Sequence, residues 1–363
     1  MEKFNKFEYM EEYGYEQLCL FHDKSTGLKA LTCVHNSVLG PGLGGTRVWN
    51  YATEDEAMMD VLRLARGMTY KNSIAGLPLG GGKSVVIGDA RELAKDSVRF
   101  EAFWRAFGRF VEGLGGRYIT AADVGTNETV MTHIKKETDN VVGLPGGCGS
   151  PSPYTARGVF NSIKACCKHV YGSDSVEGKT VAIQGVGAVG YFLCEHLHKA
   201  GAKLIVTDVY QPNVDKVVED FGAKVVAPED IYGVECDIYS PNALGAIIND
   251  ETIPQLKCKI VCGGANNQLK EPAVHGKKLQ EKGIVYAPDY VANGGGVIHV
   301  SFEVRPGGWS YEKAIAEVDA IYGRMVEILA MSDKTGELSY LCADKMAEAR
   351  IEAIMKIKGL YLP

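Results

Sequence analysis

The feature that most constrains the fold of this chain is a glycine motif between an expected strand and an expected helix. Residues 180–184 have the composition of a buried strand, residues 185–190 read Gly-Val-Gly-Ala-Val-Gly, and residues 191–199 have the pattern of a helix. In this context a G-x-G-x-x-G motif is typical of a parallel sheet that binds a dinucleotide, whose pyrophosphate lies at the helix N-terminus. The motif therefore predicts a dinucleotide site on an α/β domain.

The three glycines of this motif have separate expected roles. We expect Gly185 to make the tight turn, Gly187 to let the backbone approach the pyrophosphate, and Gly190 to let the helix pack closely on the strand. The predicted phosphate-binding loop is completed by the intervening residues Val186, Ala188 and Val189.

A carboxylate follows the next expected strand. Residues 204–207 predict that strand, and Asp208 comes directly after it, eighteen residues beyond Gly190. A carboxylate at this point binds the ribose hydroxyls, and it would repel a 2′-phosphate. Because no arginine follows within residues 209–213, the sequence favours NAD over NADP. The alternative is that Asp208 only caps the next turn.

Three further strands are expected in the same half of the chain, at residues 237–240, 259–262 and 284–287. Amphipathic stretches between most of them are long enough for right-handed crossovers, which predicts a doubly wound parallel sheet. Polar residues, among them Asn242 and Asn266, follow these strands. Ligands of open α/β sheets bind at the carboxyl ends of strands, so these two are candidate cofactor-binding residues.

The composition excludes several classes of protein. A length of 363 residues predicts two domains, and the net charge of −6, without basic runs, argues against a nucleic-acid partner. There is no uninterrupted apolar run long enough to span a membrane, and the N-terminal Met-Glu-Lys does not begin a signal peptide. The ten cysteines are scattered without a C-x-x-C pair. We therefore expect a cytoplasmic protein with a small-molecule partner and no metal.

The first half of the chain predicts another α/β pattern. A helix over residues 53–70 begins with Thr53 and Glu56 at capping-box spacing, and a second helix over 97–114 ends before two glycines. Short strands are expected at residues 84–87 and 118–120. The turn-forming residues 146–153 then indicate a hinge and domain boundary, and residues 312–357 have a helical pattern.

Two lysines twelve residues apart lie in an unusual setting. Lys71 and Lys83 occur in a stretch of apolar residues and glycines, residues 67–83. Burial near another cation lowers the pKa of a lysine, which would make Lys83 a base while Lys71 stays charged and holds a carboxylate. The alternative is a glycine loop with two lysines that reach solvent. Asp123 ends an expected strand and is either a proton carrier or a turn residue; the sequence does not show whether it meets Lys83.

Six motifs, in order and in register over nearly the whole chain, resemble those of the glutamate, leucine, phenylalanine and valine dehydrogenases. Among these, the chain looks most like the leucine dehydrogenases. The motifs are Gly40–Arg47, Gly67–Lys83, Asp123–Thr126, Gly185–Gly190, Ala265–Leu269 and Ala287–Tyr290.

The resemblance implies a reaction and a role for several residues. The reaction is reversible oxidative deamination, in which an L-amino acid, NAD and water give a 2-oxo acid, ammonia and NADH. Lys71 would bind the substrate carboxylate, Lys83 would be the catalytic base, and Asp123 would assist proton transfer. Thr155 and Asn266 would contact the nicotinamide end of the cofactor. The alternative from another class is a catalytically silent NAD-binding sensor.

The resemblance also implies a domain organisation. Residues 1–145 and about 332–363 would form an α/β substrate and oligomerisation domain, and residues 146–331 a Rossmann domain, with a cleft between them. A homo-oligomer, from dimer to octamer, would form through the first domain. The chain departs from the leucine dehydrogenase pattern at Ala122, Asn242 and Gly294, where we expect Glu, Cys and Ala.

The resemblance places an apolar side-chain pocket around five residues, Leu43, Gly44, Ala121, Val297 and Val300. Glutamate-specific relatives have a lysine at the position of Leu43, so glutamate is disfavoured. Phenylalanine-specific relatives tend to carry Gly and Leu in place of Ala121 and Val297. We therefore expect branched aliphatic substrates, leucine first, with valine and isoleucine; phenylalanine or valine dehydrogenase and plain core packing of these residues are the alternatives.

Overall fold

The structure is a computed structural model that describes residues 5–358, and the chain divides into two compact units. The first comprises the chain up to Gly149, Val300–Gly308 and the chain from Ala347; the second comprises Ser150–His299 and Trp309–Met346. The division falls within the stretch 146–153 that sequence analysis marks as a hinge. The chain enters the first unit at Val300–Gly308 and again from Ala347, whereas a single return at about residue 332 is expected from the sequence.

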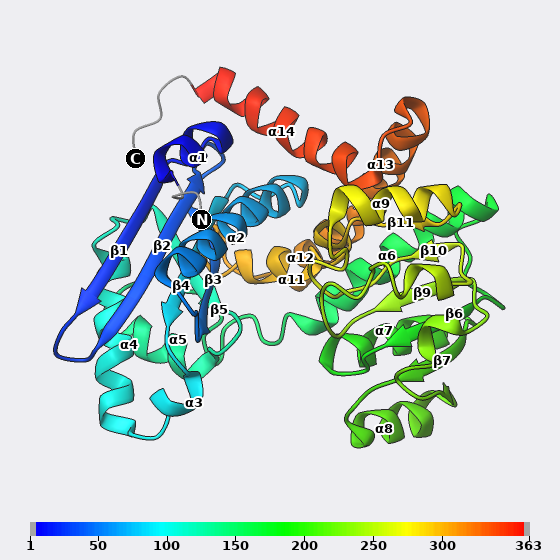
Figure 1. The fold of residues 1–363 in the computed structure, drawn as a ribbon, viewed down its shortest axis with the longest axis horizontal. Coiled ribbons are helices and arrows are strands. Elements are labelled where there is room, and N and C mark those ends of the chain that lie inside the picture. The colour runs from blue at the N-terminus through cyan, green and yellow to red at the C-terminus, as the bar shows by residue number, and fades with distance from the viewer. Residues whose placement is uncertain (1–4, 359–363) are drawn as a thin grey trace. The chain divides into compact units, whose positions relative to one another are not determined.

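The first unit is built on a five-stranded mixed sheet in the order β1-β2-β4-β3-β5 (Figure 1). Its strands are β1 (Gln17–Asp23), β2 (Leu28–Asn36), β3 (Gly42–Trp49), β4 (Gly80–Ile87) and β5 (Tyr118–Ala122). Its helices are α1 (Lys6–Tyr13), α2 (Glu54–Ile74), α3 (Ala90–Leu93), α4 (Ser97–Glu112) and α5 (Glu128–Lys135). β2 is antiparallel to β1 and β4, whereas β3 runs parallel to β4 and β5.

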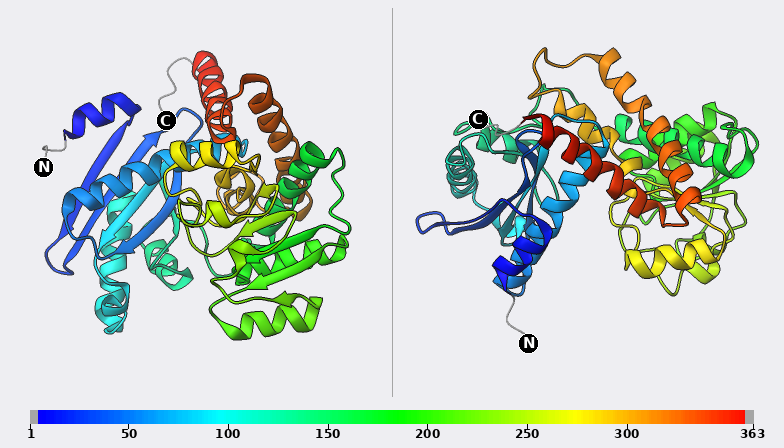
Figure 2. Two further views of the ribbon diagram at one scale, coloured as in Figure 1. Left: turned by 45° about the vertical axis from the view of Figure 1, so that its right-hand side comes forward. Right: turned by 90° about the horizontal axis from the view of Figure 1, so that it is seen from above.

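Both faces of this sheet are apolar, because successive side chains of a strand point to opposite faces. Val85 of β4 belongs to the core beneath α2, together with Val61 of that helix. Its neighbour Val86 belongs to the opposite core, where Trp104 of α4 is fully buried. The sheet is thus covered by α2 on one face, as the views in Figure 2 show, and by α4 and α5 on the other.

The glycine run before Lys83 is a strand and not a loop. β4 begins at Gly80, four residues before the predicted start, and the alternative of a glycine loop is wrong here. A Cβ on Gly81 would lie 2.1 Å from the backbone nitrogen of Thr69 in α2. A Cβ on Gly82 would lie 2.7 Å from the ring of Tyr118. These glycines are therefore needed because α2 and β5 approach β4 too closely for side chains.

The N-terminus of α2 confirms the predicted cap with one difference. The Thr53 hydroxyl accepts a hydrogen bond from the Glu56 N–H at 3.1 Å, as a capping box requires. The Glu56 carboxylate, however, accepts from the N–H of Ala52 at 2.8 Å, one residue further back than expected. The second predicted helix ends at Glu112 and not at residue 114.

The second unit is built on a six-stranded sheet in the order β11-β10-β9-β6-β7-β8, with every neighbouring pair parallel. Counted from β6, this is the strand order 3-2-1-4-5-6 of a doubly wound dinucleotide-binding fold, which confirms the predicted fold class. The strands are β6 (Thr180–Gln184), β7 (Lys203–Thr207), β8 (Lys224–Val225), β9 (Ile238–Pro241), β10 (Ile260–Val261) and β11 (Val285–Tyr286). The short edge strand β8 is absent from the predicted set.

The remaining helices are α6 (Ser152–Tyr171), α7 (Ala188–Lys199), α8 (Gln211–Phe221), α9 (Pro272–Glu281), α10 (Asp289–Ala292), α11 (Gly295–Ser301), α12 (Tyr311–Asp319), α13 (Ile321–Thr335) and α14 (Ser339–Lys358). Of these, α7, α8 and α9 lie between strands, whereas only short 3-10 turns join β8 to β9 and β9 to β10, and α10–α14 follow the last strand (Figure 1). The predicted helical tail corresponds to the last three helices. Among the described residues, no helix is both long and apolar enough to cross a membrane.

Candidate functional site

Lys83 and Asp123 meet in the structure. Lys83 lies in β4, Asp123 directly follows β5, and β3 lies between the two strands. The Lys83 Nζ is 2.8 Å from the Asp123 Oδ2. The side chain of Lys83 is only 7% exposed, whereas that of Asp123 is 24% exposed. The contact that the sequence left open is therefore present, and it joins a buried amine to a carboxylate that solvent reaches.

A second cation, Arg47 of β3, binds the same carboxylate. Its Nε donates to the Asp123 Oδ2 at 3.1 Å, and its Nη1 donates to the Asp60 Oδ2 at 3.2 Å. The hydroxyl of Tyr51 donates to that oxygen of Asp60 at 2.5 Å. None of these three residues is predicted as a site residue from the sequence: Arg47 ends one of the six motifs, but Asp60 lies in α2 and Tyr51 in the segment after β3.

The electrostatics of this cluster favour an ionised carboxylate beside a weakened ammonium. Burial lowers the pKa of Lys83 and the charge of Arg47 lowers it further, while Asp123 offsets part of this effect. Burial alone would raise the pKa of Asp123, but Lys83 and Arg47 together hold it below its usual value. Lys83 thus releases its proton more readily than an exposed lysine does.

Three of the predicted pocket residues lie on neighbouring strands of the first unit. Leu43 and Gly44 belong to β3, and Ala121 of β5 lies opposite Gly45 in the register. Leu43 is only 1% exposed. A Cβ on Gly44 would lie 1.8 Å from the carbonyl oxygen of Gly82, so only glycine fits there. Leu43 and Gly44 thus lie on the strand next to that of Lys83, and Ala121 on the strand beyond it.

The two predicted valines lie three residues apart on α11. Val297 is buried and belongs to the second unit, whereas Val300 is half-buried and begins the Val300–Gly308 segment of the first.

Lys71 lies near the C-terminal end of α2 and is half-buried. The next residue, Asn72, is fully buried, and its amide donates to the carbonyl oxygens of Gly80 at 2.6 Å and Leu43 at 3.3 Å. These bonds fasten the end of α2 to β4 and β3. Asn72 therefore fixes the backbone that carries both lysines and the apolar strand, a role that its place in the sequence motif did not indicate.

The glycine loop of the second unit has three different local geometries. Gly185 has φ +90°, a value that favours glycine, and a Cβ there would lie 2.7 Å from that of Ala243. A Cβ on Gly190 would lie 2.1 Å from the Gly185 carbonyl oxygen. A Cβ on Gly187 would meet nothing within 4 Å. A turn at Gly185, an open space at Gly187 and a close approach at Gly190 thus follow one another around the N-terminus of α7.

Asp208 is bonded to this loop. One carboxylate oxygen accepts from the N–H of Val186 at 2.7 Å, and the other accepts from the N–H of Tyr210 at 2.9 Å. The second bond caps the turn after β7, which is the alternative role that the sequence suggests for Asp208. Each oxygen retains a further acceptor site. Capping and ribose binding are therefore compatible.

The other predicted cofactor residues occupy the same unit. The Asn242 Oδ1 accepts from the N–H of Gly264 at 2.8 Å and thereby links the loops after β9 and β10. Asn266 is exposed, and its Oδ1 accepts from the Asn293 amide at 2.7 Å. Thr155, in the first turn of α6, donates to a carbonyl of the preceding turn at 3.1 Å. Asn242 and Asn266 lie in the loops that follow the parallel strands β9 and β10, at the carboxyl edge of the sheet.

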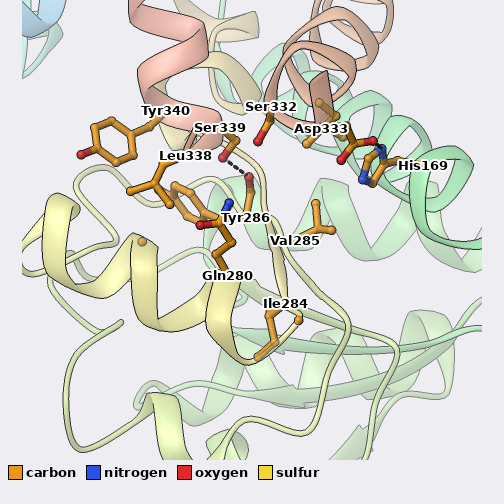
Figure 3. A pocket seen from close by; sticks show the side chains of 13 residues that line it. His169, Gln280, Ile284, Val285, Tyr286, Ser332, Asp333, Leu338, Ser339 and Tyr340 are labelled. Carbon is orange, nitrogen blue, oxygen red and sulfur yellow. Dashed lines mark hydrogen bonds and ion pairs between the residues drawn. The ribbon is translucent and has the colours of Figure 1, made fainter. Parts of the chain in front are cut away.

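The second unit has a cavity of about 200 Å³, and none of the predicted site residues line it (Figure 3). It is lined by residues of α6, α9, β11, α13 and the start of α14, and of the loops between them. Ser339 donates to the carbonyl of Tyr286 at 2.6 Å, and His169 lies 3.6 Å from Asp333. Within residues 5–358, no cluster of three His, Cys, Asp or Glu residues is arranged to hold a metal.

Two family models together match most of the chain. The model of the Glu/Leu/Phe/Val dehydrogenase dimerisation domain matches residues 16–140. The model of Glutamate/Leucine/Phenylalanine/Valine dehydrogenase matches residues 146–210 and 206–359. The chain belongs to this family. Members of the Glu/Leu/Phe/Val dehydrogenase family are nicotinamide-dependent, and the chain is an amino acid dehydrogenase, an oxidoreductase that acts on a CH–NH2 group.

Relatives within the family act on different amino acids. Leucine dehydrogenase of Thermoactinomyces intermedius is 56% identical over 359 residues, which are 98% of this chain and 96% of that protein. Phenylalanine dehydrogenase of Lysinibacillus sphaericus is 46% identical over 323 residues, 87% of this chain and 83% of that one. The crystal structure of L-tryptophan dehydrogenase from Nostoc punctiforme superposes on this chain with a TM-score of 0.86. The match covers 96% of this chain and 99% of that chain, at 40% sequence identity.

Proposed function

We propose that the protein catalyses NAD-dependent reversible oxidative deamination of branched-chain aliphatic L-amino acids, with L-leucine as the preferred substrate. The observation that carries this proposal is the buried Lys83, paired with Asp123 on strands that flank the apolar Leu43. An amine with a lowered pKa beside a carboxylate suits proton transfer near neutral pH. Identity of 56% to a leucine dehydrogenase supports the choice of substrate.

The residues of the first unit divide the work between binding and proton transfer. Lys71, as an ammonium, binds the substrate α-carboxylate. Neutral Lys83 takes a proton from the water that attacks the oxidised Cα. Asp123 moves the proton from the resulting hydroxyl to the departing ammonia. In the balanced reaction, amino acid, NAD⁺ and water give 2-oxo acid, ammonium, NADH and one proton.

The glycine loop fits a dinucleotide. The space beside Gly187 leaves room for a pyrophosphate, which the free N–H groups at the start of α7 would bind. Asp208 would bind the ribose hydroxyls, and its charge argues for NAD over NADP. Thr155 and Asn266 would hold the nicotinamide end, and Asn242 is a further cofactor-binding candidate. When bound, the cofactor accepts the hydrogen and electron pair that leave the substrate Cα.

The apolar character of the pocket supports a branched aliphatic substrate. A glutamate side chain would bring a carboxylate against Leu43, which is buried and offers no cation. We assign Leu43, Gly44, Ala121, Val297 and Val300 to the side-chain pocket. Discrimination among apolar side chains is modest, about 1–3 kcal/mol per methylene, so valine and isoleucine are expected as substrates too.

The dimerisation-domain match over residues 16–140 supports a homo-oligomer formed through the first unit. Light scattering on the purified protein tests this; a monomeric mass at micromolar concentration would contradict it.

The test of the proposed function is a panel of L-amino acids with NAD and with NADP, followed by absorbance of the reduced cofactor. We expect high kcat/KM for leucine, valine and isoleucine, low values for phenylalanine, almost none for glutamate, and a preference for NAD. Glutamate as best substrate would refute the pocket assignment. Phenylalanine as best substrate would favour phenylalanine dehydrogenase, and cofactor binding without turnover of any amino acid would favour a sensor.

A further inference from the structure

We propose that Arg47 is a positioning residue for the deamination reaction, holding the Asp123 carboxylate against Lys83 while Asp60 holds Arg47 in turn. The inference rests on the proposed function, because it assigns a task to a group that touches Asp123 and not the substrate.

Both cations bind the same oxygen of Asp123. The Lys83 Nζ lies 2.8 Å and the Arg47 Nε 3.1 Å from Oδ2. Within residues 5–358, the structure gives no hydrogen bond to Oδ1. The two contacts therefore fix the direction of the carboxylate and leave one oxygen to take or give the proton. With Arg47 removed, a single ion pair would hold Oδ2 and the carboxylate could rotate.

The guanidinium of Arg47 is held by two carboxylates. Its guanidinium donates through Nε to Asp123 and through Nη1 to Asp60, whose Oδ2 also accepts from Tyr51. The side chains of Arg47 and Asp60 are 23% and 29% exposed, so the bonds are only partly screened by solvent. A planar guanidinium can bind two carboxylates in fixed directions, whereas the point charge of a lysine cannot.

The cluster also sets the proton affinity of the reacting groups. The charged or titratable groups in direct contact with Asp123 or its anchor are Lys83 from β4, Arg47 from β3, Asp60 from α2, and Tyr51. Arg47 lowers the pKa of both Lys83 and Asp123. Burial and Asp60 raise the pKa of Tyr51, which therefore stays protonated. Loss of Arg47 should thus raise the pKa of Lys83 and of Asp123 and move the activity profile toward alkaline pH.

The experiment compares the wild type with R47M, R47K and D60N, using the full chain, L-leucine and NAD. The control is R105M, because Arg105 forms a comparable ion pair elsewhere in the first unit. Arg105 lies in α4, and its Nε donates at 2.6 Å to the carboxylate of Glu137, which follows α5. We expect R47M to lower kcat about tenfold or more, to change KM for leucine by less than about threefold, and to shift the pH profile of kcat/KM upward by about one unit. R47K, which keeps the positive charge, should show a smaller upward shift. D60N should lower kcat without an upward shift, because the charge of Asp60 raises the pKa of Lys83. R105M should change neither kcat nor the profile.

Three results overturn the inference. A folded R47M enzyme with the pH profile of the wild type would do so, whatever its kcat, because a purely structural role would leave the profile in place. If R47M does not fold, a wild-type profile in R47K together with a wild-type kcat in D60N would do so as well. Absence of any amino acid deamination by the wild type would refute the proposed function, and the role of Arg47 with it. A shifted profile in folded R47M beside an unchanged R105M supports the inference.

Discussion

Substitution of two glycines of the same loop should separate cofactor binding from stability. A Cβ at Gly187 meets nothing within 4 Å, and its φ of −65° suits alanine. A Cβ at Gly190 would lie 2.1 Å from the carbonyl oxygen of Gly185. Gly187→Ala should therefore fold normally but fill the space assigned to the pyrophosphate, whereas Gly190→Ala should strain the packing of α7 on the loop.

The magnitudes follow from these contacts. Ordinary van der Waals contact begins near 3.4 Å, so the loop or helix around Gly190 must move by more than an ångström. Overpacking of this kind costs about 1–3 kcal/mol, and Tm should fall by several degrees. For Gly187→Ala the cost to stability should be about 1 kcal/mol, because alanine is a poorer helix N-cap than glycine but meets no steric clash here. Its loss of NADH affinity should be at least about tenfold, or ~1.4 kcal/mol.

Thermal unfolding and NADH fluorescence titration on the two variants provide the assay, with the wild type as reference. NADH binding by Gly187→Ala with the wild-type Kd would refute the assignment of the phosphate site. Unchanged Tm in Gly190→Ala would refute the packing argument.

Two other predictions concern the cofactor carboxylate and a buried histidine. Asp208→Ser should narrow the preference for NAD over NADP, measured as the ratio of their kcat/KM values; a wild type that uses both cofactors equally would contradict the role of Asp208. His35 accepts from or donates to the Thr69 hydroxyl at 2.8 Å, and burial lowers its pKa to about 4. The unfolded chain therefore binds this proton first, so about 3 kcal/mol of stability should be lost as pH falls from 6.5 to 4. His35→Asn should weaken this dependence in Tm measurements, and parallel pH curves for both proteins would speak against it.

The parts of the fold that the sequence predicts best are those fixed by neighbouring residues. The strand before Gly185, the glycine turn and the helix after it form one local motif, and Asp208 follows at a distance set by one crossover. The same holds for the Thr53 cap of α2. In these cases a few adjacent residues determine the backbone conformation, so pattern and structure agree.

The parts that the sequence did not predict depend on packing between distant segments. Gly81 and Gly82 lie in a strand that α2 and β5 approach closely, whereas composition alone suggests a flexible loop there. Lys83 and Asp123 meet because the strand order β4-β3-β5 leaves only one strand between the strands that carry them. Arg47 and Asp60 meet only because α2 covers that part of the sheet. The identity of such partners is a property of the topology and not of spacing in the chain.

The central claim is that Lys83 is the base and Lys71 the carboxylate-binding group, and kinetics of their alanine variants test it most directly. Lys83→Ala should lower kcat by about 10²–10⁴-fold, because proton transfer in the transition state is lost. Lys71→Ala should chiefly raise KM for L-leucine, with a smaller loss in kcat. In the wild type, kcat/KM for deamination should rise toward alkaline pH as Lys83 and the substrate amine lose their protons. A near-normal kcat in a Lys83→Ala enzyme that circular dichroism shows to be folded would contradict the account and move the role of base to Asp123.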